Sequence, residues 1–302
     1  MSTSAQQRAI ELHSSDDLAD RRRARMLRLF IASFVRNRTA VFGAVTIIVF
    51  TVAALIAPLL PTDPLEQDYD SLMLPPSVEH PIGTDSLGRD NLIRLIHGGR
   101  VSLQVGLLAM LIATTVGVTI GLVAGYFGKW TDSILMRLVD VILAFPGLLL
   151  AILMVAVLGP SLRNAMLAIA IGFIPPFARI TRANTLSLRE KEFVESARAI
   201  GGGPIRIMFK TILPNTVSPI IVQASLGMSY AILIEASLSF LGLGIQPPTP
   251  SWGYMLSAGR EFITLAWWLT TFPGLAIFLV VIAWNFIGDG IREALDPRQR
   301  RR

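Results

Sequence analysis

The chain alternates between long apolar runs and polar segments that carry most of its charges. Because a helix needs about 20 residues to cross a hydrocarbon core of roughly 30 Å, runs of this length predict membrane-spanning helices. The run that begins at residue 165 is short before Pro175 and Pro176, so we expect it to continue through Ile180. The pattern therefore predicts an all-α integral membrane protein with six transmembrane helices, at residues 39–60, 101–126, 138–158, 165–177, 217–241 and 265–287.

The first apolar run has one alternative interpretation, a cleaved signal peptide. The apolar part of a signal peptide is only about 7–15 residues long. The run 39–60 is longer and follows a long polar leader. An uncleaved membrane anchor is the better interpretation.

Composition agrees with a membrane protein. Hydrophobic residues make up 52% of the chain and charged residues 16%, whereas soluble domains contain about 25% charged residues. The absence of cysteine excludes disulfides and cysteine-ligated metals. The net charge of +6 would suggest nucleic acid in a soluble protein. Here the basic residues flank apolar runs, so we expect no nucleic-acid partner.

The basic residues predict the orientation in the membrane. Arginines are concentrated in the N-terminal segment 1–38, in the loop 178–215 and in the C-terminal tail 291–302. The positive-inside rule places all three in the cytoplasm. The polar segments 61–100 and 242–264 then lie outside the cytoplasm. We therefore expect a basic cytoplasmic segment (1–38), a first transmembrane helix (39–60), an extracytoplasmic segment (61–100), a five-helix core (101–290) and a cytoplasmic tail (291–302).

The sequence contains no catalytic motif. A Walker A motif is absent, and the most similar stretch, residues 125–130, differs in spacing and in its last residue. No H-E-x-x-H or G-x-S-x-G is present. No paired polar groups are evident within the apolar runs. These observations favour transport or channel function over an enzyme, and we expect no cofactor on this chain.

Small residues recur every fourth position in the second apolar run, at Ala109, Ala113, Gly117, Gly121 and Gly125. This spacing places them along one ridge of a helix, where another helix can approach closely in lipid. The partner helix belongs either to the same subunit or to a second subunit.

The long basic loop contains an amphipathic pattern. Residues 192–200 consist of good helix formers, and Gly201 can end a helix in the left-handed conformation. Pro204 suits the first turn of a second helix, which we expect Pro214 to end. The loop is therefore predicted to form a compact helix–turn–helix on the cytoplasmic face. An ordinary solvated loop is the alternative.

This pattern resembles the E-A-A loop of permease subunits in bacterial ATP-binding-cassette importers. In that family, the glutamate is followed by a glycine and by a final Leu-Pro. Two mild departures are Ser196, where alanine is usual, and Thr211, where isoleucine is frequent. The resemblance implies a coupling helix that docks on an ATPase subunit, with these residues at the contact: Glu192, Glu195, Ser196, Ala197, Ile200, Gly201, Leu213 and Pro214.

Three further stretches, residues 80–90, 235–253 and 288–298, resemble the dipeptide/oligopeptide/nickel branch of this family, in particular its second, DppC/OppC-like permease. The first stretch contains the extracytoplasmic motif Gly83, Thr84, Asp85, Gly88, Arg89 and Asp90. In physical terms, Thr84 or Asp85 can cap the next helix, and the glycines allow tight turns. A metal site built from His80, Asp85 and Asp90 is an alternative that the ligand pattern makes less favourable.

The resemblance implies a binding-protein-dependent, MetI-like permease fold that works by alternating access. The implied partners are a second homologous permease, two ATPases or one fused ATPase that bind ATP and Mg²⁺, and an extracytoplasmic substrate-binding protein. The implied substrates are di- or oligopeptides, with nickel, haem or glutathione as alternatives. A stand-alone secondary transporter or channel is a rival hypothesis, and a membrane scaffold is a weaker one.

Glu235 is the unusual residue of the fifth apolar run. A charge near the middle of a bilayer costs about 2.5–3.5 kcal/mol even on insertion scales. Glu235 should therefore face a partner or an aqueous pathway. We treat it as a candidate pathway residue, with a structural hydrogen bond near the outer membrane surface as the alternative.

Overall fold

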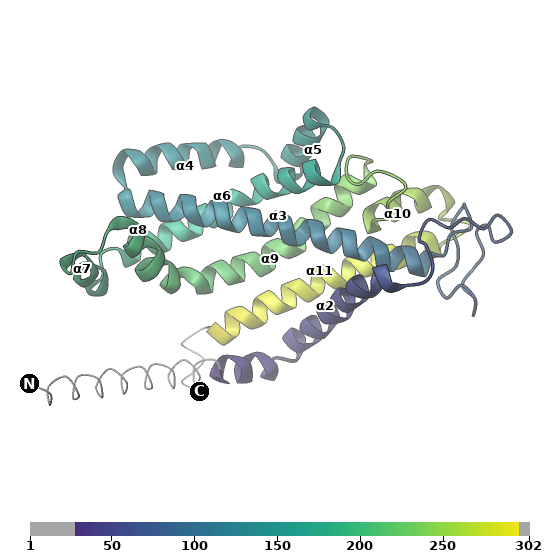
Figure 1. The fold of residues 1–302 in the computed structure, drawn as a ribbon, viewed down its shortest axis with the longest axis horizontal. Coiled ribbons are helices and arrows are strands. Elements are labelled where there is room, and N and C mark those ends of the chain that lie inside the picture. Colours follow the sequence, from purple (N-terminus) through teal and green to yellow (C-terminus); the bar gives the residue numbers. More distant parts are fainter. Residues whose placement is uncertain (1–27, 296–302) are drawn as a thin grey trace, which may run out of the picture.

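The computed structural model describes residues 28–295, and within this range the regular elements are helices. Residues 28–36 form a helical segment before the first long helix. The helices labelled in Figure 1 are α2 (Arg38–Ile56), α3 (Asn91–Phe127), α4 (Lys129–Leu143), α5 (Gly147–Leu158), α6 (Leu162–Leu188), α7 (Glu192–Ala199), α8 (Pro204–Arg206), α9 (Leu213–Phe240), α10 (Trp252–Gly259) and α11 (Trp268–Leu295).

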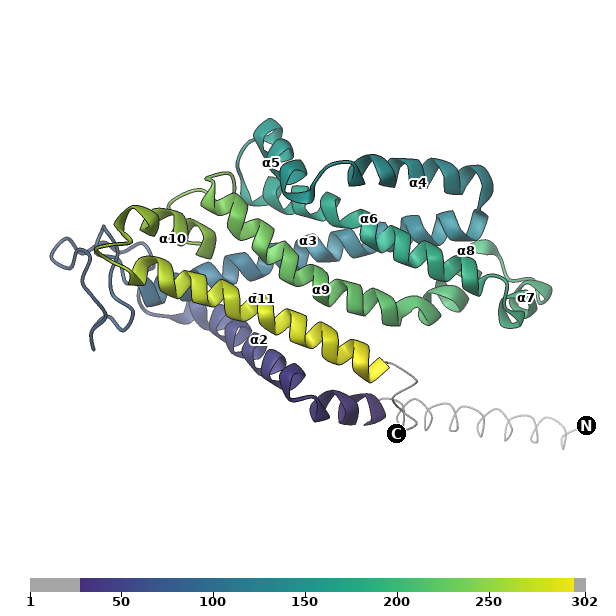
Figure 2. The ribbon, with the colours of Figure 1, turned by 180° about the vertical axis from the view of Figure 1, so that it is seen from behind.

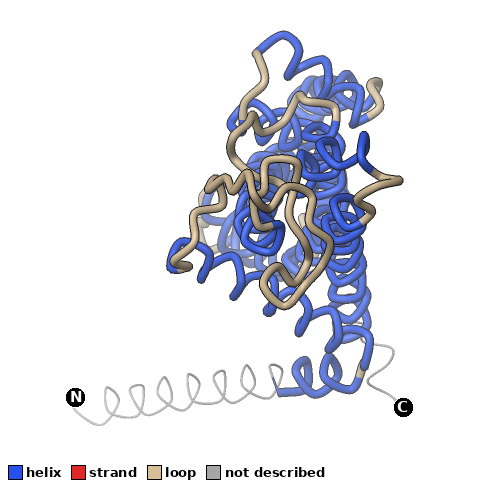
Figure 3. Tube along the Cα trace, turned by 90° about the vertical axis from the view of Figure 1, so that its right-hand side faces the viewer, coloured by secondary structure: helices blue, strands red, loops and turns tan. Residues whose placement is uncertain are grey.

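The long helices run side by side and give the molecule two distinct ends. Helix α10 and the segment between α2 and α3 lie at one end, whereas α7 and α8 lie at the other (Figures 1 and 2). Figure 3 shows the loops of the first end gathered in front of the helices. The described chain ends, near residues 28 and 295, lie toward the α7 end. The charge pattern predicts that the α7 end is cytoplasmic.

Five helices are long and apolar enough to cross a membrane, and a bent pair can form a sixth span. The bent pair is α4 and α5, whose axes differ by 87°. The predicted span over residues 138–158 therefore corresponds to a bent pair of helices and not to one continuous helix. The break falls at Phe145 and Pro146, because the residue before a proline is driven out of the helical conformation.

Three predicted boundaries do not coincide with the helix ends. Helix α3 begins at Asn91, inside the predicted extracytoplasmic segment 61–100. Helix α6 continues through Pro175 and Pro176 to Leu188, so the loop does not begin at residue 178. Helix α11 continues past residue 290 to Leu295. Residues 1–27 of the predicted N-terminal segment and 296–302 of the tail lie outside the described residues.

The second half of the predicted helix–turn–helix also differs from the prediction. Pro214 does not end a helix, because α8 leads through a π-helical turn (Ile207–Ile212) into α9. In that turn the Leu213 N–H donates to the Met208 carbonyl, five residues back. The wider turn changes the hydrogen-bond register immediately before Pro214, which has no N–H to donate. The helix therefore passes through the proline.

The ridge of small residues on α3 packs inside the subunit, against α6. A Cβ atom on Gly117 would lie 2.6 Å from Cβ of Phe177, and one on Gly121 would lie 2.4 Å from the Ala178 carbonyl oxygen. Such distances leave no room for any side chain. Of the two alternatives for this ridge, packing within the same subunit is confirmed.

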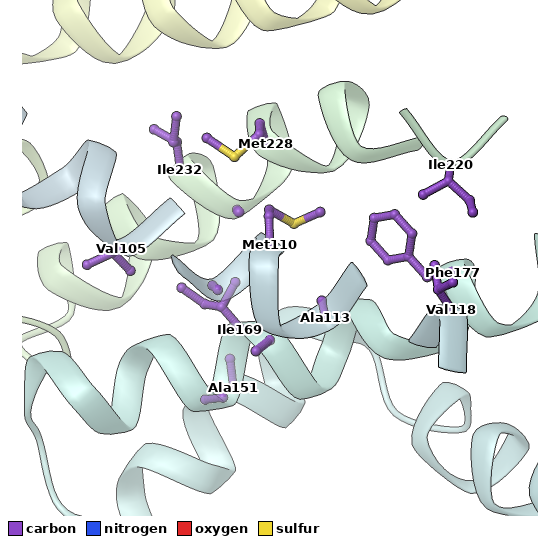
Figure 4. Close-up of a cluster of buried hydrophobic side chains, with 14 of the residues drawn as sticks. Val105, Met110, Ala113, Val118, Ala151, Ile169, Phe177, Ile220, Met228 and Ile232 are labelled. Carbon is purple, nitrogen blue, oxygen red and sulfur yellow. The ribbon is translucent and has the colours of Figure 1, made fainter. Parts of the chain in front are cut away.

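The apolar interior is formed where α3, α5, α6 and α9 meet. Figure 4 shows Met110 of α3 and Met228 of α9 on facing helices, with Ile169 and Phe177 of α6 nearby. Ala151 brings the short helix α5 into the same cluster. This cluster holds α5 against the bundle despite its bend away from α4.

The topology can be tested with cysteines, since the chain has none of its own. Val78 is fully exposed between α2 and α3, and Ile205 is 72% exposed in α8. We expect Val78→Cys and Ile205→Cys to react with an impermeant thiol reagent from opposite sides of the membrane, Val78→Cys from outside. Labelling of both from one side would contradict the arrangement of six crossings.

Candidate functional site

The helix α7 projects from the bundle at the predicted cytoplasmic end. Acidic residues lie in its first turn and Arg198 lies in its last, as the helix dipole favours. Val194 is fully buried and anchors one face of the helix, together with Ile207 and Ile212. The guanidinium of Arg198 lies 5.5 Å from the ring centroid of Tyr126, at the end of α3. These contacts fix α7 relative to α3 and to the start of α9.

The turn after α7 depends on two glycines. Gly201 has φ of +83°, and a Cβ added there would meet no atom within 4 Å. Gly202 donates its N–H to the Ala197 carbonyl over 3.0 Å, and its own Cβ would lie 2.5 Å from that oxygen. The predicted role of Gly201 as a left-handed helix cap is confirmed. Gly202, which the sequence did not single out, is required for the close approach.

Most of the predicted docking residues lie on the outside of this projection. Glu192, Glu195, Ser196, Ile200 and Gly201 are exposed, with Ile200 at 82%. Ala197 is half-buried. Leu213 is half-buried and Pro214 exposed, both in the first turn of α9.

Three exposed apolar residues that the sequence did not single out extend this surface. They are Phe193 on α7, Ile205 on α8, and Phe209 in the π-helical turn. We call Phe193, Ile200, Ile205 and Phe209 the apolar docking patch. The exposed glutamates Glu192 and Glu195 lie on the same projection. Apolar groups with a charged rim are the usual composition of a protein–protein contact.

The motif predicted to be extracytoplasmic forms a compact turn that holds the α2–α3 segment to the start of α3. Thr84 is fully buried. Its hydroxyl donates to the Ser71 carbonyl over 2.5 Å and accepts the Leu74 N–H over 2.8 Å. Trp268 of α11 donates its indole N–H to the Thr84 carbonyl over 3.1 Å. The motif thereby joins three distant parts of the chain.

Asp85 is the charged centre of this motif. Its carboxylate accepts from Nε of Arg89 over 2.7 Å and lies 3.5 Å from Nε of Arg94. Arg94 is almost completely buried and also donates to the Pro64 carbonyl over 3.1 Å. The three groups leave one uncompensated positive charge beside a cavity of about 30 Å³ whose lining includes Asn91 and Met255. A buried arrangement of this kind requires every partner to be present.

Asp90, not Thr84 or Asp85, caps helix α3. Its Oδ1 accepts the N–H groups of Leu92 and Ile93 over 2.8 and 3.1 Å. Its Oδ2 lies 2.9 Å from Nδ1 of His80. His80 and Asp90 therefore pair with each other, while Asp85 faces arginines. Among residues 28–295, no three His, Asp or Glu side chains are grouped as metal ligands, so the alternative of a metal site gains no support.

Gly88 lies against the carbonyl of Asp68, so closely that an added Cβ would overlap the oxygen at 1.7 Å. Its φ of +72° is also a glycine conformation. The Ser71 hydroxyl and the Asp70 N–H, both donating to the Asp68 carboxylate, lower the pKa of that group. Gly83 has φ of +75°, so both glycines have the turn-forming role expected of them.

Glu235 is enclosed between α9 and α3, with 1% of its surface exposed. Its Oε1 accepts from the Ser239 hydroxyl over 2.8 Å, whereas Oε2 has no partner. Ser102 of α3 is fully buried and lies beside the same carboxyl. Ser239 also accepts the Ile245 N–H, in the loop after α9, over 3.4 Å. In this conformation Glu235 organises the end of α9 and does not face an open surface.

Two substitutions at Glu235 separate the structural interpretation from a pathway role. Glu235→Gln keeps an acceptor for Ser239, so we expect normal assembly and near-normal uptake. Glu235→Leu removes that acceptor and should destabilise the protein by about 1–3 kcal/mol. The measurements are the thermal midpoint of the purified complex and substrate uptake. A glutamine variant that assembles normally but loses uptake would instead indicate that the charge acts in the pathway.

Charge pairs between α4 and α6 were missed from the sequence. Arg182 donates to both carboxylate oxygens of Asp132, over 2.5 and 2.6 Å. Arg179 donates to Asp140 over 2.6 Å, and both side chains are more than half exposed. Asp132 lay before the predicted third span, and both arginines were assigned to a cytoplasmic loop. The i, i+3 spacing of Arg179 and Arg182 was the signal that could have indicated their place on one face of a helix.

The parts described so far define a class of protein. Residues 28–295 form a helical bundle with a folded, charged turn at one end and an exposed amphipathic helix at the other. These features are those of a helical integral membrane protein.

A family model named "Binding-protein-dependent transport system inner membrane component" matches residues 117–301, and a second, for the N-terminal transmembrane domain of oligopeptide transport permease C, matches residues 25–76. The chain belongs to this family of binding-protein-dependent inner-membrane transport components. It is therefore an integral inner-membrane permease subunit of the ATP-binding-cassette importer class.

Similar proteins cover nearly the whole chain. The dipeptide transport system permease protein DppC of Alkalihalophilus pseudofirmus is 50% identical, over 88% of both chains. The di/tripeptide transport system permease protein DppC of Pseudomonas aeruginosa is 46% identical, over 90% of this chain and 92% of its own. The glutathione transport system permease protein GsiD of Pectobacterium atrosepticum is 45% identical, over 90% and 91%.

A solved structure supports the fold. The MetNI methionine ABC transporter in an inward-facing conformation contains a chain that matches with a TM-score of 0.54 and 17% identity. The match covers 68% of this chain and 98% of that one. The expected MetI-like fold is confirmed.

Proposed function

We propose that this chain is one of two permease subunits of an ATP-driven importer that moves di- or oligopeptides into the cytoplasm. The observation that carries the substrate class is the similarity, at 46–50% identity over about nine-tenths of the chain, to permeases named for dipeptides and di/tripeptides. Glutathione, itself a tripeptide, is the substrate named for a relative of nearly equal identity. The shared chemistry of these substrates is a short peptide backbone.

The exposed helix α7 supports ATPase coupling. Helix α7 and its apolar docking patch lie at the end of the bundle that the arginine distribution assigns to the cytoplasm. In this proposal, two ATPase subunits, or one fused ATPase, bind ATP and Mg²⁺ and move α7 when they close. The permease binds no cofactor of its own. A binding protein delivers peptide to the opposite end, over the segment 61–90 and α10.

The proposal is tested by reconstituting the chain with its partner permease, its ATPases and its binding protein in proteoliposomes. We expect ATP-dependent uptake of a labelled dipeptide and ATPase activity that rises when peptide-loaded binding protein is added. Parallel uptake measurements with glutathione and with nickel ions define the substrate class. Uptake by the chain alone, without ATPase, would favour the secondary-transporter hypothesis.

A further inference from the structure

Helix α9 carries a stripe of neutral polar side chains on its outer face. Gln223, Tyr230 and Ser237 are spaced by seven residues, which places them within about 20° of one line along the helix. Tyr230 is 60% exposed, and Gln223 and Ser237 are half-buried. We call these three residues the α9 polar stripe.

The stripe lies at the depth of the hydrocarbon core. Helix α9 ends at Phe240, near the outer end of the bundle. At a rise of about 1.5 Å per residue, Tyr230 is roughly 15 Å and Gln223 roughly 25 Å below that end. With Phe240 placed at the outer boundary of a core about 30 Å thick, Tyr230 lies near the middle and Gln223 is still inside.

Two of these side chains have no hydrogen-bond partner in the described part of the chain. The Ser237 hydroxyl donates to the Leu233 carbonyl over 2.8 Å, but no bond to Gln223 or Tyr230 is found within residues 28–295. Lipid tails cannot supply one, and tyrosine favours the membrane interface over the centre. The stripe must therefore face water or a polar partner.

The surroundings of the stripe support this conclusion. One flank of α9 is covered by α11, where Ser229 donates to the Val281 carbonyl over 3.1 Å. The other flank meets α3 and α6, where Gly227 faces Met110 and Phe173. Figure 2 shows α9 between α11 and α6 on the face toward the viewer. The exposed face of α2 is aliphatic by contrast, with Val45, Val49 and Val52, as expected for lipid contact.

We propose that the α9 polar stripe lines the peptide route and that Gln223 and Tyr230 hydrogen-bond the main chain of the passing peptide. The proposal rests on the proposed function. An amide and a phenol both donate and accept, so they match peptide N–H and C=O groups whatever the peptide side chains are. Neutral groups bind more weakly than charges, which lets the peptide move on. Glu235 is separate, because it points into the interior.

Cysteine accessibility tests the location of the stripe. Gln223→Cys and Tyr230→Cys are compared, in the complete complex in proteoliposomes, with Val49→Cys, a 59% exposed position on α2. A charged, impermeant thiol reagent reacts only in water. We expect the two stripe positions to react at least tenfold faster than Val49→Cys in one state of the ATP cycle, and more slowly with saturating dipeptide. Rates equal to that of Val49→Cys throughout the cycle would overturn the proposal.

Transport tests the hydrogen bonds. Tyr230→Phe and Gln223→Leu should each lower dipeptide uptake roughly two- to tenfold, the ratio for one lost hydrogen bond. Subunit assembly and binding-protein-stimulated ATPase activity should be unchanged. Val49→Ala, a conservative change on the exposed face of α2, should leave uptake intact. Unchanged uptake in a variant that carries both Tyr230→Phe and Gln223→Leu would overturn the proposal. Loss of subunit assembly would also overturn it, because the stripe would then belong to a subunit interface. Absence of peptide uptake by the wild type would instead refute the proposed function.

Discussion

Gly201→Asp is expected to reduce uptake at least tenfold and to make ATP hydrolysis insensitive to peptide-loaded binding protein. Gly201 has φ of +83°, where a side chain costs about 1–2 kcal/mol, although aspartate is tolerated there better than most residues. The site is open, so the permease should still fold and insert. The new carboxylate adjoins the exposed Ile200 and would have to be desolvated in an ATPase contact. The measurement is stimulated ATPase activity of the reconstituted complex.

Gly159→Asp is the matched control for this variant. Gly159 has φ of +89° and an equally open Cβ position, but it lies in the turn between α5 and α6, away from α7. We expect it to keep normal stimulation. Glu195→Lys, which reverses a charge on α7, should weaken coupling without affecting insertion. Wild-type stimulation in both α7 variants, with normal uptake, would show that this helix does not couple the ATPase to the pore.

Asp85→Ala is expected to destabilise the outer end of the bundle by about 3–5 kcal/mol, the usual cost of removing one partner of a buried ion pair. The variant leaves Arg89 and Arg94 without their carboxylate and removes the acceptor of the Leu87 and Arg89 N–H groups. Segment 61–90 should then become sensitive to added protease, and the thermal midpoint should fall. Both are measured on the purified complex.

Asp70→Ala is the matched control for this second variant, since it removes one negative charge from an exposed position of the same segment. We expect its thermal midpoint and protease resistance to equal those of the wild type. Asp85→Asn, which keeps an acceptor oxygen, should be intermediate. If Asp85→Ala behaved like Asp70→Ala, the cluster would not be what holds the segment in place.

Local features of the sequence were sufficient for much of the fold. Long apolar runs located α2, α9 and α11 because the cost of placing backbone and charges in lipid depends on each segment alone. The spacing of small residues on α3 predicted a close helix contact because helix geometry is local. Gly201 predicted the end of α7 because a left-handed cap requires only the residues around it. The docking residues of α7 rest instead on the resemblance to the E-A-A loop, and their contact with an ATPase stays a prediction.

The positions and partners of the charged residues were decided only by the tertiary structure. The sequence pattern assigned Arg182 to a loop. In the structure it lies on α6 and pairs with Asp132, fifty positions away. The sequence allowed Asp85 to be a helix cap or a metal ligand, whereas in the structure it lies beside Arg94. Glu235 could face a pathway or the interior, and only the packing of α3 and Ser239 encloses it. The physical reason is common to all three: the free energy of a charged group depends on its burial and on the position of its partners, which only the folded structure fixes.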